Sequence, residues 1–289
     1  MNKVPAPTFD DAAALRALAN NRRVGSYPHL QSAVAAIEQG YSQYVTAGGD
    51  AFSVQKVAVS DDVRTYLRNH YKDPPRDLEH ITELRSASEH LCCPMCGSMH
   101  SGTLDHMLPK NTYGEFAVFS LNLVPACKCN SKRQETVTGA SPGERVLHPY
   151  FDNCLSERLI AACFEDLGLV PRIGVRLIVP SHHSHFNAIR FHVRSIVERT
   201  AIKNHLIRSW SNLCRKPSLM VRALARNPVS VLELKATLVE ELSLLDDQHG
   251  SKNNWASVFV AGLLDDDVCY WLFQRLNAPG RAPDAPLIY

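Results

Sequence analysis

The chain has 289 residues, of which 45% are hydrophobic and 21% charged, so it is long enough for one large or two smaller domains. Its formal net charge of +2 excludes a strong global positive field as the basis of nucleic-acid binding. No apolar run approaches the roughly 18 residues of a membrane span, and the first residues lack the apolar core of a signal peptide. We therefore expect a cytoplasmic protein with no membrane partner, whose nine cysteines are thiols or metal ligands.

The first third of the chain predicts a helical arm, residues 1–88. Apolar residues recur at helical spacing in residues 10–22 and 30–45. Ser60 is a suitable N-cap for a third helix, which we expect to stop before Pro74.

The rest of the chain divides into a compact middle and a mainly helical domain. Residues 89–152 are rich in short extended pieces, cysteines and glycines, and predict a small module. Residues 153–289 begin with two strand-like runs, RLIAACFED and RIGVRLIV, which predict a hairpin. Helical periodicity then predicts helices over 187–213, 231–245 and 254–276. The expected fold class is α+β, a mostly helical chain with a small module of strands in the middle.

Two pairs of cysteines lie at either end of the middle module, in CPMCG and CKCN. The expected zinc ligands are Cys93, Cys96, Cys127 and Cys129. Four thiolates around one structural Zn²⁺ would stabilise a segment too short to build its own hydrophobic core. The CxC spacing requires the chain to bend at Lys128 so that both sulfurs converge. Cys92 is an alternative to Cys93 as a ligand, and a set of reduced structural cysteines is the interpretation without metal.

Between the cysteine pairs, Asp105 and His106 end a predicted strand, and Asn130 opens a predicted short helix. Hydrolysis of a phosphodiester needs a base that activates water and a cation that neutralises developing charge. His106 can be the general base, since imidazole is available in its neutral form near neutral pH. The oxygens of Asp105 and Asn130 suit a catalytic Mg²⁺ or Mn²⁺. Asn122, expected midway in the second strand, would brace the loop that carries His106.

Three cations flank this group, and Lys110, Lys132 and Arg133 could hold the phosphates of a substrate. Each feature alone has an ordinary explanation, because Asp-His pairs are common, asparagine often caps helices, and lysine and arginine are usually solvated. The joint occurrence of the motifs in this order favours a functional site. His148, in LHPYFD, is either a buried hydrogen-bonded side chain or an auxiliary group that reaches the phosphate.

The segment from Cys93 to Arg133 resembles the HNH nuclease family, whose ββα-metal module carries a histidine base, a metal-binding aspartate, a middle asparagine and a final histidine or asparagine. The resemblance implies His106 as base, Asp105 and Asn130 as ligands of one divalent ion, and Asn122 as the structural asparagine. The motifs TLDHMLPK, NLVPAC and LHPYFD further resemble a bacterial group of HNH nucleases. The second cysteine pair, CKC, is one residue shorter than that group's pattern.

This resemblance implies a zinc-stapled HNH module that hydrolyses DNA. Duplex DNA is the first expectation for the substrate, and the sequence leaves single-stranded DNA and RNA open. Some nucleases of the bacterial group are encoded beside ATPases in phage-defence systems of the Septu and retron-associated kind. The resemblance therefore implies an anti-phage effector, gated by a partner ATPase or by homo-oligomerisation through the helical flanks. The alternative is a non-catalytic zinc-containing subunit that binds nucleic acid or a protein partner.

Overall fold

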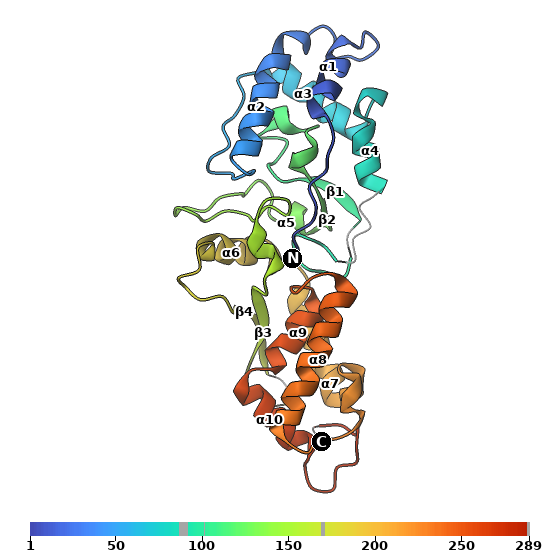
Figure 1. Ribbon diagram of the computed structural model, residues 1–289, viewed down its shortest axis with the longest axis vertical. Helices are drawn as coiled ribbons and strands as arrows, with labels where there is room; N and C mark the ends of the chain where they lie inside the picture. Colours follow the sequence, from blue (N-terminus) through green and yellow to red (C-terminus); the bar gives the residue numbers. More distant parts are fainter. Residues whose placement is uncertain (87–91, 101, 169–170, 288–289) are drawn as a thin grey trace.

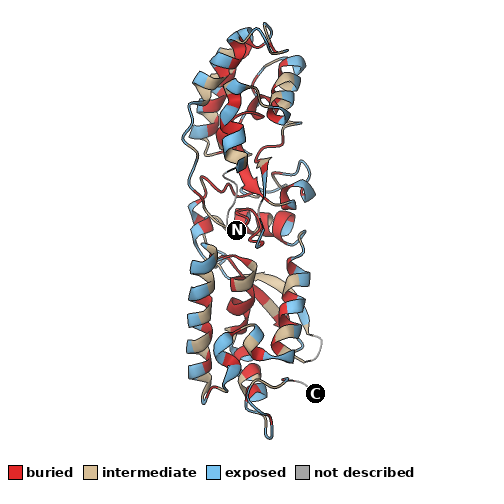
Figure 2. Ribbon diagram, turned by 90° about the vertical axis from the view of Figure 1, so that its right-hand side faces the viewer, coloured by how far each residue is buried: buried red, intermediate tan, exposed pale blue. Residues whose placement is uncertain are grey.

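The computed structural model describes residues 1–86, 92–100, 102–168 and 171–287. The molecule is elongated, with helices at both ends and a smaller mixed region between them (Figure 1). Buried hydrophobic residues form three clusters, one in each of these regions. At the two ends the buried residues lie on the inner faces of the helices (Figure 2).

The amino-terminal end consists of helices, as the sequence predicts. The helices are α1 (Asp11–Asn20), α2 (Val34–Thr46), α3 (Asp61–Lys72) and α4 (Glu79–Ser86). Helix α3 begins at the predicted N-cap, where the Ser60 side chain accepts a hydrogen bond from the backbone N–H of Val63. It ends immediately before Asp73, ahead of the predicted proline stop.

The first residues of the chain lie apart from these helices and belong to the centre of the molecule (Figure 1). The amino group of Met1 donates to the Asn253 carbonyl at 3.0 Å, and the N–H of Asn2 donates to the Pro94 carbonyl at 2.9 Å. This segment joins the first cysteine pair to the carboxy-terminal part, a contact that the boundary of the predicted arm does not anticipate.

The central region contains two short antiparallel strands, β1 (Thr103–His106) and β2 (Leu123–Ala126), followed by one turn of helix, α5 (Cys129–Lys132). His106 pairs with Leu123 at one end of the ladder, so the cysteines after β2 lie near the start of β1. The prediction for Asn122 was wrong in one respect: it lies in a 3₁₀ turn (Ser120–Asn122) before β2, not midway in the strand.

The carboxy-terminal part is built on the predicted hairpin, which the structure confirms as β3 (Ile160–Glu165) paired antiparallel with β4 (Arg172–Leu177). The helices are α6 (Phe186–His192), α7 (Ile202–Arg215), α8 (Val231–His249), α9 (Trp255–Leu263) and α10 (Asp266–Leu276). Helix α9 packs closely on β3 at Gly262. A Cβ at this position would lie 2.6 Å from the Ala162 carbonyl oxygen, so the close packing requires glycine.

Two of the long helices expected from periodicity are interrupted. Helix α6 passes into a π-helical turn (Val193–Val197), and α7 begins only at Ile202. The Thr200 hydroxyl donates to the Val197 carbonyl and accepts from the Ile202 N–H, so its side chain replaces backbone bonds of a continuous helix. The expected helix over 254–276 divides before Asp266, where acidic residues favour a new helix start. Among the described helices, none combines the length and apolarity needed to cross a membrane.

Candidate functional site

The four predicted zinc ligands converge on one point. The sulfurs of Cys93, Cys96, Cys127 and Cys129 all lie within 4.8 Å of one another. The Sγ atoms of Cys93 and Cys129 are 3.7 Å apart and those of Cys96 and Cys127 are 3.5 Å apart, with all four as free thiols. A tetrahedral Zn²⁺ with Zn–S bonds of about 2.3 Å places its sulfurs about 3.8 Å apart. The cluster could therefore hold a metal such as zinc.

The local backbone explains how the short CKC pair converges. Lys128 has φ −65° and ψ 2°, so the chain bends there as expected and Cys129 becomes the first residue of α5. The N–H of Cys129 then donates to the Cys127 sulfur at 3.3 Å. Hydrogen bonds from the neighbouring thiols, that of Cys129 first, lower the pKa of Cys127 and favour its thiolate form. Cys92, the alternative ligand, is buried but lies outside the cluster formed by the described residues.

The first cysteine pair is held by a tight turn against the carboxy-terminal part. The N–H of Gly97 donates to the Cys93 carbonyl at 2.8 Å, which closes the turn. Gly97 has φ +78°, and a Cβ at this position would lie 2.0 Å from the Asn253 carbonyl oxygen. Only glycine satisfies both the left-handed backbone and the close approach.

His106 is buried at the end of β1, with its side chain 2% exposed and its ring packed edge-on against Tyr71 at 4.2 Å. Its Nε2 lies 2.9 Å from the Ala117 carbonyl oxygen. Because a carbonyl only accepts hydrogen bonds, Nε2 carries the proton and Nδ1 carries the lone pair. Burial lowers the pKa of His106 below its ordinary value, so the ring is neutral at neutral pH.

His148 and His192, two of the three other buried histidines among the described residues, differ from His106 in their partners. In His148 and His192 the Nε2 atom also faces backbone carbonyls, those of Leu121 and Met95. Their Nδ1 atoms, however, accept backbone N–H groups from Tyr150 and Leu147 at 3.2 and 3.0 Å. In the described part of the chain, no such donor reaches Nδ1 of His106, whose nearest charged neighbour is Asp105 Oδ1 at 3.9 Å. The lone pair of His106 is thus available to another group.

Asp105 and Asn130 lie beside His106. The Asp105 Oδ1 accepts from the N–H of His106 at 2.8 Å, and the Asn130 amide donates to the His106 carbonyl at 3.0 Å. Burial raises the pKa of Asp105, but hydrogen bonds from His106 and Asn130 outweigh this effect, so the net pKa is lowered. Its side chain is 33% exposed. An ionised carboxylate therefore faces solvent next to a neutral imidazole.

These side chains open into a cavity of about 420 Å³. Its walls are formed by Asp105, His106, Pro109, Lys110, Asn111, Asn130, Ser131, Arg133, Gln134 and Glu135. Lys110 is the predicted phosphate-binding lysine that lies here, with its Nζ 4.8 Å from the centre of the Tyr71 ring. Lys132 lies on the other side of α5 and lines a different cavity. The two lysines therefore line different cavities.

Arg133 departs from the sequence prediction, because it is buried with 1% exposure. Its Nε donates to Asn130 Oδ1 at 2.6 Å, and one terminal nitrogen donates to the carbonyls of His106 and Met107 at 2.9 and 2.5 Å. Burial lowers its pKa to about 10, which leaves it charged at neutral pH. Arg133 is therefore committed to internal carbonyls, and we assign it a positioning role instead of phosphate binding.

Asn122 is fully buried and braces the loop after His106. Its Oδ1 accepts from the Leu108 N–H at 2.7 Å and from the Tyr44 hydroxyl at 3.1 Å, and its amide donates to the carbonyls of Leu108 and Phe116. His148 Nε2 contacts the same Tyr44 hydroxyl at 3.1 Å. Of the two roles considered for His148, the buried, hydrogen-bonded one agrees with the structure.

Sequence reasoning missed Tyr71 and Tyr44, which come from the amino-terminal helices. Tyr71 covers the His106 ring and its hydroxyl donates to the Leu104 carbonyl at 2.5 Å, while Tyr44 bonds Asn122. Both tyrosines sit on the apolar faces of predicted helices, where a core residue and a site residue have the same pattern. No signal in the sequence distinguishes the two.

Comparison with known proteins gives one partial similarity. The chain is 39% identical over 62 residues to a protein of Escherichia phage lambda named Protein ea31, and the match covers 21% of each chain. The chain thus spans about a fifth of that relative's length. No protein-family model matches the chain, and no solved structure matches it.

Proposed function

We propose that the protein is a metal-dependent endonuclease of the HNH type, which hydrolyses phosphodiester bonds of DNA in the cavity beside α5. The observation that carries the proposal is the state of His106: neutral, with Nε2–H committed to the Ala117 carbonyl and the Nδ1 lone pair available. A base of this kind, beside a carboxylate and an amide at a cavity wall, is what phosphodiester hydrolysis requires.

The residues divide the chemical work as follows. His106 accepts a proton from the attacking water through Nδ1, while the Ala117 carbonyl stabilises the protonated ring through Nε2. Tyr71 fixes the plane of the imidazole by its edge contact. Lys110, at the same cavity, neutralises part of the charge of the phosphate.

Asp105 and Asn130 fit a divalent cation such as Mg²⁺ or Mn²⁺, which when bound would neutralise charge on the phosphate and the leaving oxygen. Asp105 offers an ionised, partly exposed carboxylate. Asn130 Oδ1 already accepts from Arg133 Nε at 2.6 Å but keeps its second lone pair. Arg133 thereby orients the amide so that its oxygen is fixed next to the cavity.

A role in anti-phage defence, gating by a partner ATPase and self-association are part of the proposal and rest on the sequence resemblance. A structural zinc at the thiolate cluster would support the module by holding the loop after β2, from which α5 and Asn130 start. Its function would be separate from that of a magnesium or manganese ion held by the oxygens of Asp105 and Asn130.

The test is a cleavage assay of the purified full chain on plasmid, single-stranded DNA and RNA with Mg²⁺ or Mn²⁺. His106→Ala should lower the rate at least about 100-fold, since removal of a general base costs this much or more. The matched control is His182→Ala, because this histidine is exposed and does not line the cavity. Undiminished cutting by His106→Ala rejects the base assignment. Binding of nucleic acid with no cutting under any condition would favour the non-catalytic zinc module.

A further inference from the structure

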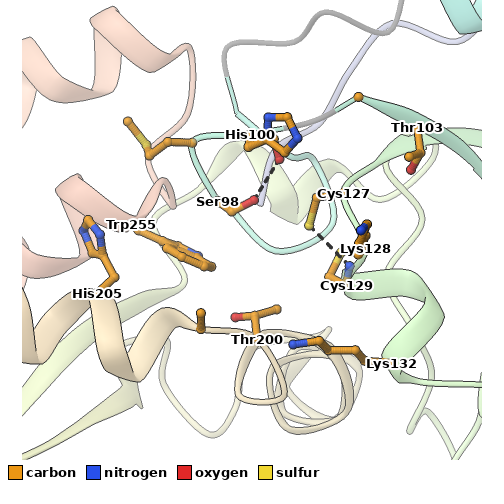
Figure 3. A pocket seen from close by; sticks show the side chains of 13 residues that line it. Ser98, His100, Thr103, Cys127, Lys128, Cys129, Lys132, Thr200, His205 and Trp255 are labelled. Carbon is orange, nitrogen blue, oxygen red and sulfur yellow. Dashed lines mark hydrogen bonds between the residues drawn. The ribbon is translucent and has the colours of Figure 1, made fainter.

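A second cavity, with a volume of about 580 Å³, lies on the other side of α5 from the proposed catalytic cavity. Its lining residues include Trp255 and His205 on one wall, Thr200 below, and Lys128 and Lys132 opposite (Figure 3). The walls come from the first cysteine loop, the start of β1, the CKC segment, the start of α7 and α9. Cavities that bind small planar ligands commonly have this size and a mainly apolar lining.

The aromatic wall is rigid before any ligand binds. The Trp255 indole N–H donates to the Cys96 carbonyl at 2.8 Å, and the Trp255 backbone N–H donates to the Gly97 carbonyl at 3.0 Å. These bonds fix the ring to the cysteine loop. Figure 3 shows the indole projecting between the cysteine loop and α7. Because the indole is already immobilised, little side-chain entropy is lost when a flat ring stacks on it.

The polar side chains of the cavity differ in whether they already have partners. The hydroxyls of Ser98, Thr103 and Thr200 donate to backbone carbonyls. The His205 ring lies 5.6 Å from Trp255 and belongs to the same aromatic wall. On the opposite wall, Lys128 and Lys132 form no ion pair with any described residue. The cavity thus offers a stacking surface and two cationic groups.

The two cavities are close neighbours on one face of the module. Thr103 lines the larger cavity and Asp105 the catalytic one, and alternate residues of a strand point to the same side about 6 to 7 Å apart. On α5, Lys132 faces the larger cavity while Asn130 and Ser131 face the catalytic one. A nucleic-acid strand that crosses α5 would therefore reach from one cavity to the other over a short distance.

From this arrangement we propose that the larger cavity binds an unpaired nucleobase of the strand that is cut, one step from the scissile phosphate. The base stacks on Trp255 beside the His205 ring, while Lys128 and Lys132 contact the adjoining phosphate. The inference rests on the proposed nuclease function and narrows its substrate to single-stranded or looped nucleic acid. A base inside a regular duplex is stacked between its neighbours and cannot enter the cavity.

The test measures binding of 5′-labelled 12-nucleotide probes, single-stranded DNA, single-stranded RNA and duplex DNA, by fluorescence anisotropy. All proteins carry His106→Ala so that no probe is cut. Ala201→Trp fills the cavity from an exposed position on its rim, and Ala58→Trp fills an unrelated surface cavity as the matched control. Ala201→Trp should weaken single-strand binding at least about tenfold, as expected for the loss of one stacked base. Duplex binding and the control variant should be unchanged.

A second measurement follows the ring itself. Quenching of tryptophan fluorescence by the single-stranded probe should disappear in Trp255→Phe, because Trp210 and Trp271 stack on each other in the carboxy-terminal core. Unchanged single-strand binding by Ala201→Trp overturns the inference, and so does an equal loss of duplex binding, which would indicate a general backbone surface. Comparison of the binding of single-stranded DNA and single-stranded RNA shows which nucleic acid supplies the base.

The outcome is separable from that of the proposed function, because cutting is scored on the same probes without the His106 change. If the chain cuts DNA but Ala201→Trp binds single strands normally, the base site is wrong and the nuclease stands. If nothing is cut but Ala201→Trp weakens single-strand binding, the cavity is a base site of a non-catalytic protein.

Discussion

The thiolate cluster and the oxygen site, formed by Asp105 and Asn130, lie on either side of α5. The first residue of α5, Cys129, belongs to the cluster and the second, Asn130, to the oxygen site. The two sites are nevertheless built in opposite ways. At the cluster, four sulfurs face one another within 4.8 Å, and three of the four cysteines are buried. At the oxygen site, Asp105 is 33% exposed and opens into a cavity of about 420 Å³. A closed ligand set suits a structural ion, and an open one leaves room for water and substrate.

The supports of the two sites differ as well. His192 fixes the cysteine loop, since its Nε2 donates to the Met95 carbonyl at 2.6 Å, and His148 fixes the turn before β2 through the Leu121 carbonyl. Both rings are saturated with backbone partners on each nitrogen. His106 has the same Nε2 contact but keeps Nδ1 available. Among the described residues, His106 therefore differs from His148 and His192 by one missing N–H donor at Nδ1.

The largest expected effect comes from breaking the closed site. Cys129→Ser should reduce bound zinc from about one equivalent to under a tenth and destabilise the module by at least about 4 kcal/mol, since zinc binding is coupled to folding. Cys154→Ser is the control, because Cys154 is equally buried, at 2% exposure, but lies outside the cluster. Metal analysis and chemical denaturation measure both quantities. Full stability of Cys129→Ser, or a wild-type protein without zinc, would support metal-free thiols.

A substitution of a ligand in the oxygen site should lower the cleavage activity and leave the zinc content unchanged. Asp105→Ala should abolish divalent-dependent cutting while retaining one equivalent of zinc, because its carboxylate lies outside the thiolate cluster. Asn122→Ala should instead lower the free energy of unfolding by about 3 kcal/mol, because it leaves several buried partners without hydrogen bonds. Asn69→Ala, at an exposed position outside the cavity wall, is the control for both assays, with an expected stability change below about 0.5 kcal/mol. Zinc loss in Asp105→Ala would show that the two sites are not independent.

The sequence was sufficient for the parts of the site that depend on local order. The spacing of the cysteines and the strand-to-helix order predicted which sulfurs converge and that Asp105, His106 and Asn130 meet. It was insufficient for Arg133, because an arginine after a helix start is normally solvated, and its burial depends on carbonyls of the loop after β1. The direction of Lys132 depends on the phase of a one-turn helix, which periodicity cannot define over so few residues.

The same limit applies to the fold. Periodicity located the helices but not their interruptions, because Thr200 and the acidic start of α10 act through side-chain contacts within an otherwise apolar pattern. The contact of Met1 with Asn253 joins residues that are 252 positions apart in the sequence, and no local pattern encodes such a pair. The sequence therefore predicted elements and local chemistry better than the contacts between distant segments.

The smallest expected effect tests the two structural histidines by pH. Burial lowers the pKa of His148 to about 3 and that of His192 to about 4, because protonation of Nδ1 would break its bond to a backbone N–H. Above the unfolded pKa of about 6.5 neither state binds the proton, so the stability is fully present. As the pH falls below 6.5, these two histidines bind protons in the unfolded chain but not in the folded chain. The stability is then lost progressively down to the folded pKa, by about 2 kcal/mol per histidine at pH 5.

Urea denaturation at pH 7 and pH 5 measures this loss, and His148→Gln isolates one of the two contributions. Glutamine does not titrate and can still donate to the Leu121 carbonyl, so the variant should lose about 2 kcal/mol less than the wild type between these pH values. His29→Gln, at an exposed position, should leave the pH dependence unchanged. An identical loss in His148→Gln and wild type would mean that the ring already takes up its proton in the folded protein. His148 would then be a titrating group, and the contrast between His106 and the histidines with partners on both nitrogens would no longer hold.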